Sequence, residues 1–147
     1  MKIFDRLHFW KPKAQLSLEQ ILQRARMDRH YWPVFYQRLL TDKLAVLSFS
    51  SVQDGAAYVR KLADGRVPIF TSTERIFDQG IIKGEVSILM FTGRELFERM
   101  RAETFVINPY SEVRKDITPV EVESMLDEKK GYGGAGEKAG IYICSGE

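Results

Sequence analysis

The segment VSILMFTGRELFERMRAETFVI, residues 86–107, decides the fold class. It begins with the apolar run Val86–Phe91, which has the length of a strand, and it ends with a second β-prone run at Thr104–Ile107. Between the two runs, Thr92 opens an amphipathic helical pattern. A strand, a helix and a second strand in this order predict a right-handed crossover between parallel strands.

Four helix starts are marked by capping boxes, in which a Ser or Thr and a Glu or Gln three residues later satisfy each other's backbone N–H groups. Pro119 follows the last of these Thr residues at the first helical position, where its missing N–H costs nothing. A further helix is expected from Pro33 to about Leu40. The boxes themselves predict helices that begin at Ser17–Gln20, Thr71–Glu74, Thr92–Glu95 and Thr118–Glu121.

The remaining apolar runs predict three more strands. Leu44–Phe49 is short and apolar, and Ala57–Leu62 and Arg66–Phe70 flank Asp64-Gly65, a dipeptide typical of hairpin turns. The expected fold class is α/β (mixed α+β). It comprises a mixed sheet of about five strands with an antiparallel hairpin and a parallel strand–helix–strand part, and helices pack on the sheet.

The chain is 147 residues long, which is the length of one domain. We expect a basic and aromatic N-terminal arm at residues 1–16, a single α/β domain at 17–130 and a glycine-rich C-terminal tail at 131–147. Within this tail, Ile141–Cys144 is β-prone. We expect it to fray with the tail, the alternative being that it adds to a sheet edge, within the molecule or on a partner.

Charge and hydropathy exclude several classes of protein. The 22 basic and 20 acidic side chains leave a net charge of +2, too small to indicate a nucleic-acid-binding protein. No apolar run is long enough for a secretory signal at the N-terminus or for a transmembrane segment. We therefore expect a cytoplasmic protein. The basic and aromatic stretch Lys2–Lys13 leaves contact with a membrane surface open.

Residues suited to metal or covalent chemistry are scarce. His8 and His30 are far apart in the sequence, and Cys144 is the single cysteine. The glycines near the C-terminus do not fit a nucleotide-binding fingerprint, and no serine lies in a nucleophile elbow. We expect no metal, no cofactor and no catalytic residue, and hence a protein that is not an enzyme.

One edge of the expected sheet is a candidate ligand site. Thr71 and Thr92 each end a predicted strand and open a predicted helix, so two helix N-termini would point out of the edge where α/β proteins place ligands. The alternative is ordinary capping, because an acidic residue three positions after each Thr already satisfies the free N–H groups. The candidate residues for binding a small anion are Thr71, Ser72, Thr92, Gly93 and Arg94.

Four motifs along the chain carry a family resemblance: FYQRLLTDKLAVL at 35–47, GRVPIFTS at 65–72, MFTGREL at 90–96 and VINPYS at 106–111. Together they resemble the N-terminal domain of SseB-like proteins, the enhanced serine sensitivity protein B family of bacteria. The pieces PIFTS and INPYS are the most specific. The resemblance implies an α/β domain without an established enzymatic activity, cofactor or catalytic residue set.

These observations predict a non-enzymatic domain that binds another protein, as a regulatory accessory module. The alternative function is a sensor of small anions or other ligands at the helix N-termini of Thr71 and Thr92. No nucleic-acid partner is expected. Self-association and contact with a membrane surface through Lys2–Lys13 are further ways in which the chain could engage a partner.

Overall fold

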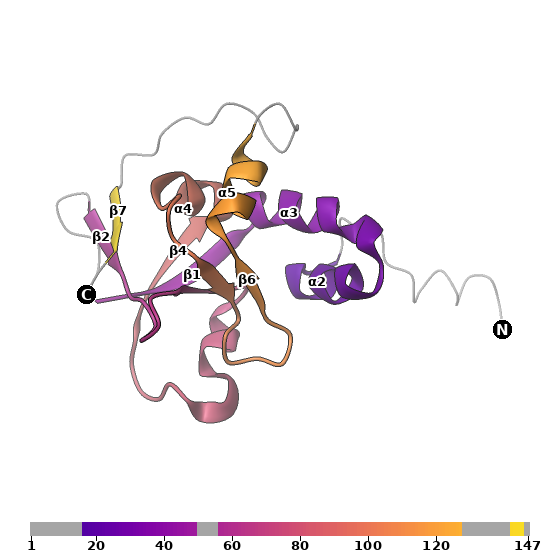
Figure 1. Ribbon diagram of the computed structural model, residues 1–147. Coiled ribbons are helices and arrows are strands. Elements are labelled where there is room, and N and C mark those ends of the chain that lie inside the picture. The colour runs from indigo at the N-terminus through magenta and orange to yellow at the C-terminus, as the bar shows by residue number, and fades with distance from the viewer. Residues whose placement is uncertain (1–15, 50–55, 128–141, 146–147) are drawn as a thin grey trace.

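The computed structural model of the chain describes residues 16–49, 56–127 and 142–145. This part of the chain forms a mixed sheet with helices packed on it (Figure 1). The helices are α2 (Leu18–Met27), α3 (Trp32–Thr41), α4 (Gly93–Arg99) and α5 (Pro119–Leu126), with 3-10 helices η2 (Arg29–Tyr31) and η3 (Thr73–Gly80). The strands are β1 (Lys43–Ser48), β2 (Ala56–Val59), β3 (Val67–Phe70), β4 (Ser87–Thr92), β5 (Phe105–Ile107), β6 (Lys115–Ile117) and β7 (Tyr142–Ser145).

Strand β1 is the centre of the sheet. β4 pairs with one of its edges in antiparallel fashion, from Lys43 opposite Thr92 to Ser48 opposite Ser87. β3 and β2 pair with the other edge one after the other, and both are antiparallel to β1. β5 and β7 continue the sheet as parallel neighbours of β3 and β2, and β6 pairs antiparallel with β5. Because parallel and antiparallel pairs coexist, the predicted mixed α+β class is confirmed.

The strand–helix–strand segment at 86–107 forms as β4, α4 and β5, but its two strands are not neighbours. Both β4 and β3 are antiparallel to β1, and β5 is parallel to β3, so β4 and β5 run in the same direction. β1 and β3 lie between them. The reason is that the backbone groups of five consecutive buried residues of β1 need hydrogen-bond partners on both edges of the strand. β4 occupies one of these edges along the whole length of β1.

The predicted hairpin of residues 57–70 is wrong, although its turn is present. Leu62 N–H donates to the Arg66 carbonyl at 2.8 Å, and Gly65 has a φ of +91°. β2 and β3 nevertheless pair with β1 rather than with each other. Both run antiparallel to the same edge of β1, and the Arg60 N–H still donates to the Leu47 carbonyl at 2.8 Å. Residues 61–66 therefore leave that edge just after β2 and return to it at the start of β3.

The C-terminal run also differs from the expected frayed end. Tyr142–Ser145 forms β7, which pairs in parallel with β2, with Cys144 opposite Tyr58. The sheet therefore continues past the expected domain boundary at residue 130. Residues 1–15, which make up nearly all of the predicted N-terminal arm, and residues 128–141 of the glycine-rich segment lie outside the described residues.

Three of the four predicted capping boxes are confirmed, at Ser17–Gln20, Thr92–Glu95 and Thr118–Glu121. The box at Thr71–Glu74 is wrong. There Ser72 is the N-cap, makes no side-chain cap hydrogen bond, and precedes a 3-10 helix. The reason lies in the Thr71 hydroxyl, which donates to Glu19 and accepts from Asn108 instead of capping the helix.

The two faces of the sheet are covered unequally. On one face, α2, α3, α4 and α5 bury the larger core cluster, which includes Leu44 and Val46 of β1. On the other face, Ala45 and Leu47 belong to a smaller cluster that is completed by Phe70, Ile76 and residues of the 82–88 segment. Helices α2 to α5 thus shield one face, whereas η3 and the segment after it cover the other in part.

A close contact of α4 with α3 depends on Gly93. A Cβ at this position would overlap the carbonyl group of Leu39, and the Gly93 N–H donates to the Asp42 carbonyl at 3.2 Å. Gly93 is therefore a packing residue that lets the start of α4 rest on the end of α3.

We expect Gly93→Ala to lower the free energy of unfolding by roughly 3 kcal/mol or more, because backbone rather than a flexible side chain blocks the added methyl group. Urea denaturation measures the effect. The control is Gly84→Ala, which meets open space at a φ of +84° and should cost only about 1–2 kcal/mol. Equal losses in the two variants would contradict this account of Gly93.

A cluster of aromatic and charged side chains joins α3, β6 and α5. The Tyr36 hydroxyl donates to Glu121 Oε2 at 2.5 Å, and Lys115 Nζ lies 3.0 Å from the same oxygen. Lys115 also lies over the ring of Trp32, 5.2 Å from its centroid. Burial alone would raise the pKa of Glu121, but the hydrogen bonds from Tyr36 and the Thr118 N–H, together with Lys115, outweigh it and hold that pKa below its ordinary value.

A carboxylate with a lowered pKa stabilises the fold above its unfolded-state pKa and loses that contribution as the pH falls. Tyr36→Phe should therefore lower stability at pH 7, and the difference from the parent chain should shrink as the pH falls below about 4.5. Urea denaturation at a series of pH values tests this, with the exposed Tyr58→Phe as the control. A deficit independent of pH would exclude the ionised Glu121 as its cause.

Candidate functional site

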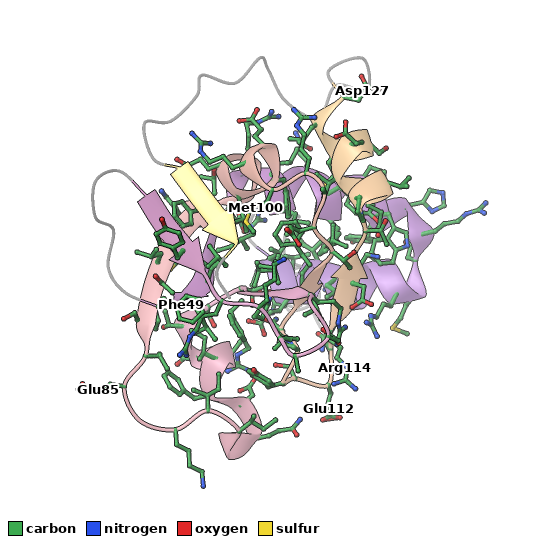
Figure 2. The ribbon with its side chains drawn as sticks, turned by 60° about the vertical axis from the view of Figure 1, so that its left-hand side comes forward. Phe49, Glu85, Met100, Glu112, Arg114 and Asp127 are labelled. Carbon is green, nitrogen blue, oxygen red and sulfur yellow. The ribbon has the colours of Figure 1, made fainter. Side chains whose placement is uncertain are left out.

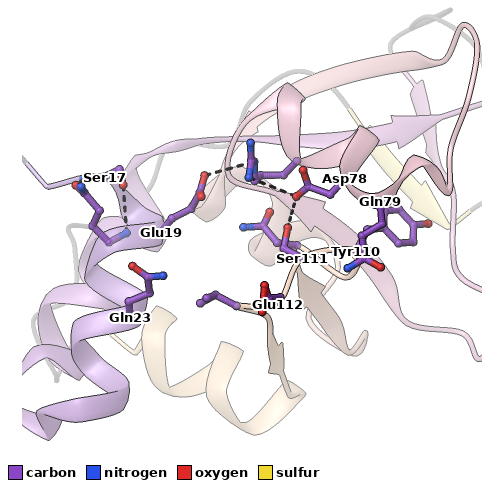
Figure 3. Close-up of a pocket in the computed structure, with 12 residues that line it drawn as sticks. Ser17, Glu19, Gln23, Asp78, Gln79, Tyr110, Ser111 and Glu112 are labelled. Carbon is purple, nitrogen blue, oxygen red and sulfur yellow. Dashed lines mark hydrogen bonds and ion pairs between the residues drawn. The ribbon is translucent and has the colours of Figure 1, made fainter.

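A polar pocket of about 550 Å³ lies where the start of α2, η3 and the turn after β5 meet (Figure 3). Its walls come from three stretches that are far apart in the sequence, at residues 17–23, 75–79 and 108–113. Carboxylate, amide and hydroxyl groups predominate among the lining side chains. The pocket therefore suits a small polar molecule better than an apolar one.

Arg75 lies between two carboxylates in this pocket. Its Nε is 4.0 Å from Glu19 Oε2, and its Nη1 is 3.5 Å from Asp78 Oδ2. The hydroxyl of Ser111 donates to the same Asp78 oxygen, as Figure 3 shows. The Arg75 Nε is buried and makes no hydrogen bond, so the guanidinium is held mainly by charge.

A second network lies beside the first and is built on Asn108. This side chain is 1% exposed, and its Oδ1 accepts from the Thr71 N–H at 3.0 Å. Its Nδ2 donates to Thr71 Oγ1 at 3.0 Å, and that hydroxyl donates to Glu19 Oε2 at 2.8 Å. The end of β3, the turn after β5 and the first turn of α2 are thereby joined through side chains.

The charges around the pocket decide what it can accept. Glu19, Asp78 and Glu112 line it together with a single cation, Arg75, so negative charge is in excess. An anion entering here would be repelled by the carboxylates, whereas a neutral or cationic polar group would not be. Two non-glycine residues of the wall, Gln79 and Asn108, have positive φ angles of 62° and 50°, a conformation that costs free energy.

The five predicted anion-binding residues are not gathered at this pocket. Thr71 and Ser72 follow β3, whereas Thr92 follows β4 on the other side of β1. The side chain of Thr71 is fully engaged by Glu19 and Asn108. Ser72 is the N-cap of a 3-10 helix rather than of an α-helix.

The remaining three residues lie at the start of α4, where the N–H groups of Thr92, Gly93 and Glu95 already have partners. Thr92 and Glu95 satisfy each other in a capping box, with Thr92 N–H donating to Glu95 Oε1 at 2.8 Å. Gly93 packs on Leu39, and Arg94 lies 3.4 Å from Glu98. Binding of an anion at these residues stays a prediction.

A different surface is formed by β4 and the face of the sheet that the helices leave open. Among the described strands, β4 pairs only with β1, so its other edge is unpaired. Figure 2 shows β4 rising from the labelled Glu85 at the rim of the molecule. Exposed apolar side chains lie on the same face of the sheet: Met90 (45% exposed), Phe49 (46%) and Tyr58 (49%).

The family comparison agrees with the motifs. The model of the SseB protein N-terminal domain matches residues 18–124, well over half of the chain. The chain belongs to the SseB N-terminal domain family. Searches of the curated proteins and of the solved structures found no match.

The two motifs most specific to the SseB resemblance meet beside the pocket, which INPYS lines and PIFTS does not. PIFTS supplies Thr71 and INPYS supplies Asn108, whose side chains bind one another. Tyr110 of the second motif packs its ring against Phe70 of the first, with centroids 5.9 Å apart. Burial raises the pKa of the Tyr110 phenol. The features that identify the SseB domain thus serve the junction between β3 and the turn after β5.

Sequence reasoning missed the pocket because its walls are assembled from distant segments. The Asn-Pro turn at 108–109 was the available signal, since Asn tolerates a positive φ better than most residues. Within the described ranges, no group of three or more His, Cys, Asp or Glu side chains could hold a metal ion. None of the helices in these ranges is long and apolar enough to cross a membrane.

We expect Asn108→Ala to destabilise the domain by roughly 2–4 kcal/mol, because it leaves the part-buried Thr71 N–H without its acceptor and keeps a side chain at positive φ. Asn108→Gly is the matched variant, since it also loses the side-chain hydrogen bonds but adopts the positive φ at this position without strain. It should be about 1 kcal/mol less costly than Ala. Thermal unfolding measures both, and an unchanged Asn108→Ala midpoint would refute the role of this side chain.

Proposed function

We propose that this SseB domain is a protein-interaction module that binds its partner along β4 and the adjacent open face of the sheet. The observation that carries the proposal is the unpaired outer edge of β4, a six-residue strand made of SILMFT. An unpaired strand edge presents backbone donors and acceptors that an extended segment of another protein can complete.

The sheet has two further outer strands, β6 and β7, and β6 supports this choice by contrast. β6 is three residues long and contains Lys115 and Asp116. Short, charged edge strands resist further pairing, whereas long apolar ones favour it. β4 has neither charge nor proline, and its residues from Ile88 to Phe91 are all apolar. Of these two edges, β4 is the one suited to a partner.

Side chains beside β4 would add to the binding energy. Met90, Phe49 and Tyr58 are each about half exposed on the same face of the sheet, and Arg60 lies over the Phe49 ring at 5.1 Å. Aromatic side chains, Met and Arg are the types enriched at protein interfaces. The proposal requires no catalytic step and no cofactor. A role as a regulatory accessory factor in the cytoplasm fits such a module.

Site-specific photo-crosslinking in living cells tests the proposal. A photoreactive amino acid at position 90 should yield a crosslinked protein. The same residue at Met27, which is 92% exposed at the end of α2, should not. Adding Met90→Lys to a chain that carries the photoreactive residue at Ser87, an exposed residue of β4, should reduce the crosslink by roughly tenfold. No protein crosslinked at position 90, or equal yields at positions 90 and 27, would exclude β4 as the binding edge.

A further inference from the structure

The backbone of β4 has a defined set of free hydrogen-bonding groups. The Gly93 N–H donates to Asp42 on the β1 side, whereas the Thr92 N–H turns away from β1 and donates to Glu95. In an antiparallel pair, alternate residues direct both their N–H and C=O groups to the same edge. Ile88 and Met90 therefore direct theirs outward, where no described strand meets them.

The outward N–H and C=O groups of one β4 can pair with the same groups of a second β4. We infer that the partner of β4 is a second copy of this chain, whose β4 pairs antiparallel about a two-fold axis at Leu89. This inference rests on the proposed use of β4 as a binding edge. With the axis at Leu89, Ile88 of each copy lies opposite Met90 of the other. Both residues of each such pair direct their N–H and C=O groups toward the partner, so the outward groups of Ile88 and Met90 are all used.

The competing register has its two-fold axis at Met90 and is poorer. It would place Ile88 opposite Thr92, whose N–H is already engaged by Glu95 at 2.8 Å. If the open faces of both copies lie on the same side of the joined sheet, residues opposite each other must belong to the same face. Such residues differ by an even number of positions, so the two-fold axis passes through a residue rather than between two residues. The capping box of α4 therefore disfavours the axis at Met90. An axis at Ile88 would pair Met90 with Val86, which lies outside β4, so the axis at Leu89 remains.

Side chains agree with this register. Ile88 and Met90 alternate with Leu89, so they share the open face of the sheet while Leu89 lies on the helix-covered face. The dimer would join Ile88 and Met90 of both copies into one apolar group, and the two Leu89 side chains would meet on the axis. Met90, 45% exposed in one copy, would be covered by the second.

The charges that flank β4 are complementary under the same symmetry. Antiparallel pairing brings the residues that precede one β4 beside those that follow the other. Lys83 then lies toward Glu95 of the second copy, and Glu85 lies toward Arg94 and the positive end of α4. Opposite charges thus face each other at both ends of the paired strands. A second copy of the chain supplies these charges by symmetry, which favours it over an unrelated protein as the partner.

Disulfide trapping tests the register. In a Cys144→Ser background, Leu89→Cys should form a disulfide-linked dimer under mild oxidation, because the two Cβ atoms at a non-hydrogen-bonded pair on the axis are close enough for a disulfide. Ser87→Cys is the control: the two copies of residue 87 would be roughly 14 Å apart along the strands and should not link. The Ile88→Cys/Met90→Cys double variant should link as well, which covers the case that Leu89→Cys does not fold. Linkage of Ser87→Cys, or failure of both predicted variants to link, would overturn the register.

Sedimentation velocity across micromolar to submillimolar concentrations tests the dimer itself. The full chain should dimerise, Met90→Lys should raise the dissociation constant by roughly tenfold or more, and Met27→Lys should leave it unchanged. A chain that stays monomeric while position 90 crosslinks to a different protein in cells would overturn this inference and leave the proposed function standing. A monomer without any crosslink would overturn both.

Discussion

The double-sided pairing of β1 is the constraint on which the rest of the structure depends. Its backbone groups are buried, so each edge must find a strand: β4 takes one edge, and β3 and β2 share the other. This requirement separates β4 from β5 and draws residues 57–70 out of a hairpin. It also places β4 at the rim, since the second edge of that strand has no described neighbour.

Local features could be predicted from the sequence because local chemistry determines them. The capping boxes at Ser17, Thr92 and Thr118 need only residues three positions apart, and all three form. The Asp64-Gly65 turn forms for the same reason. Which strands become neighbours is decided by contacts between distant residues, and there the prediction of a hairpin was wrong. Thr71 shows the same limit, because Asn108, 37 positions away, binds the hydroxyl that would have capped a helix.

The pocket and the open edge differ in how far the sequence could have revealed them. The pocket needs Glu19, Arg75 and Ser111 to meet, and no sequence pattern links them. The apolar strand at 86–91 was visible in the sequence, but its unpaired edge was not, because that edge follows from the order of strands in the sheet. The SseB family assignment rests on motifs that stabilise one junction of the fold. It is therefore more informative about architecture than about what the domain binds.

The path of residues 61–66 has a practical consequence. The chain leaves one edge of β1 after β2 and rejoins the same edge at β3, so the length of this excursion does not set the register of either strand. Its tip at Asp64-Gly65 is exposed, and the space beside Gly65 is open. A peptide epitope or a fluorescent reporter could be grafted there while the central sheet stays intact, since loop length adds little entropic cost. The excursion is thus a natural attachment point for labels in experiments that must leave both β4 and the pocket undisturbed.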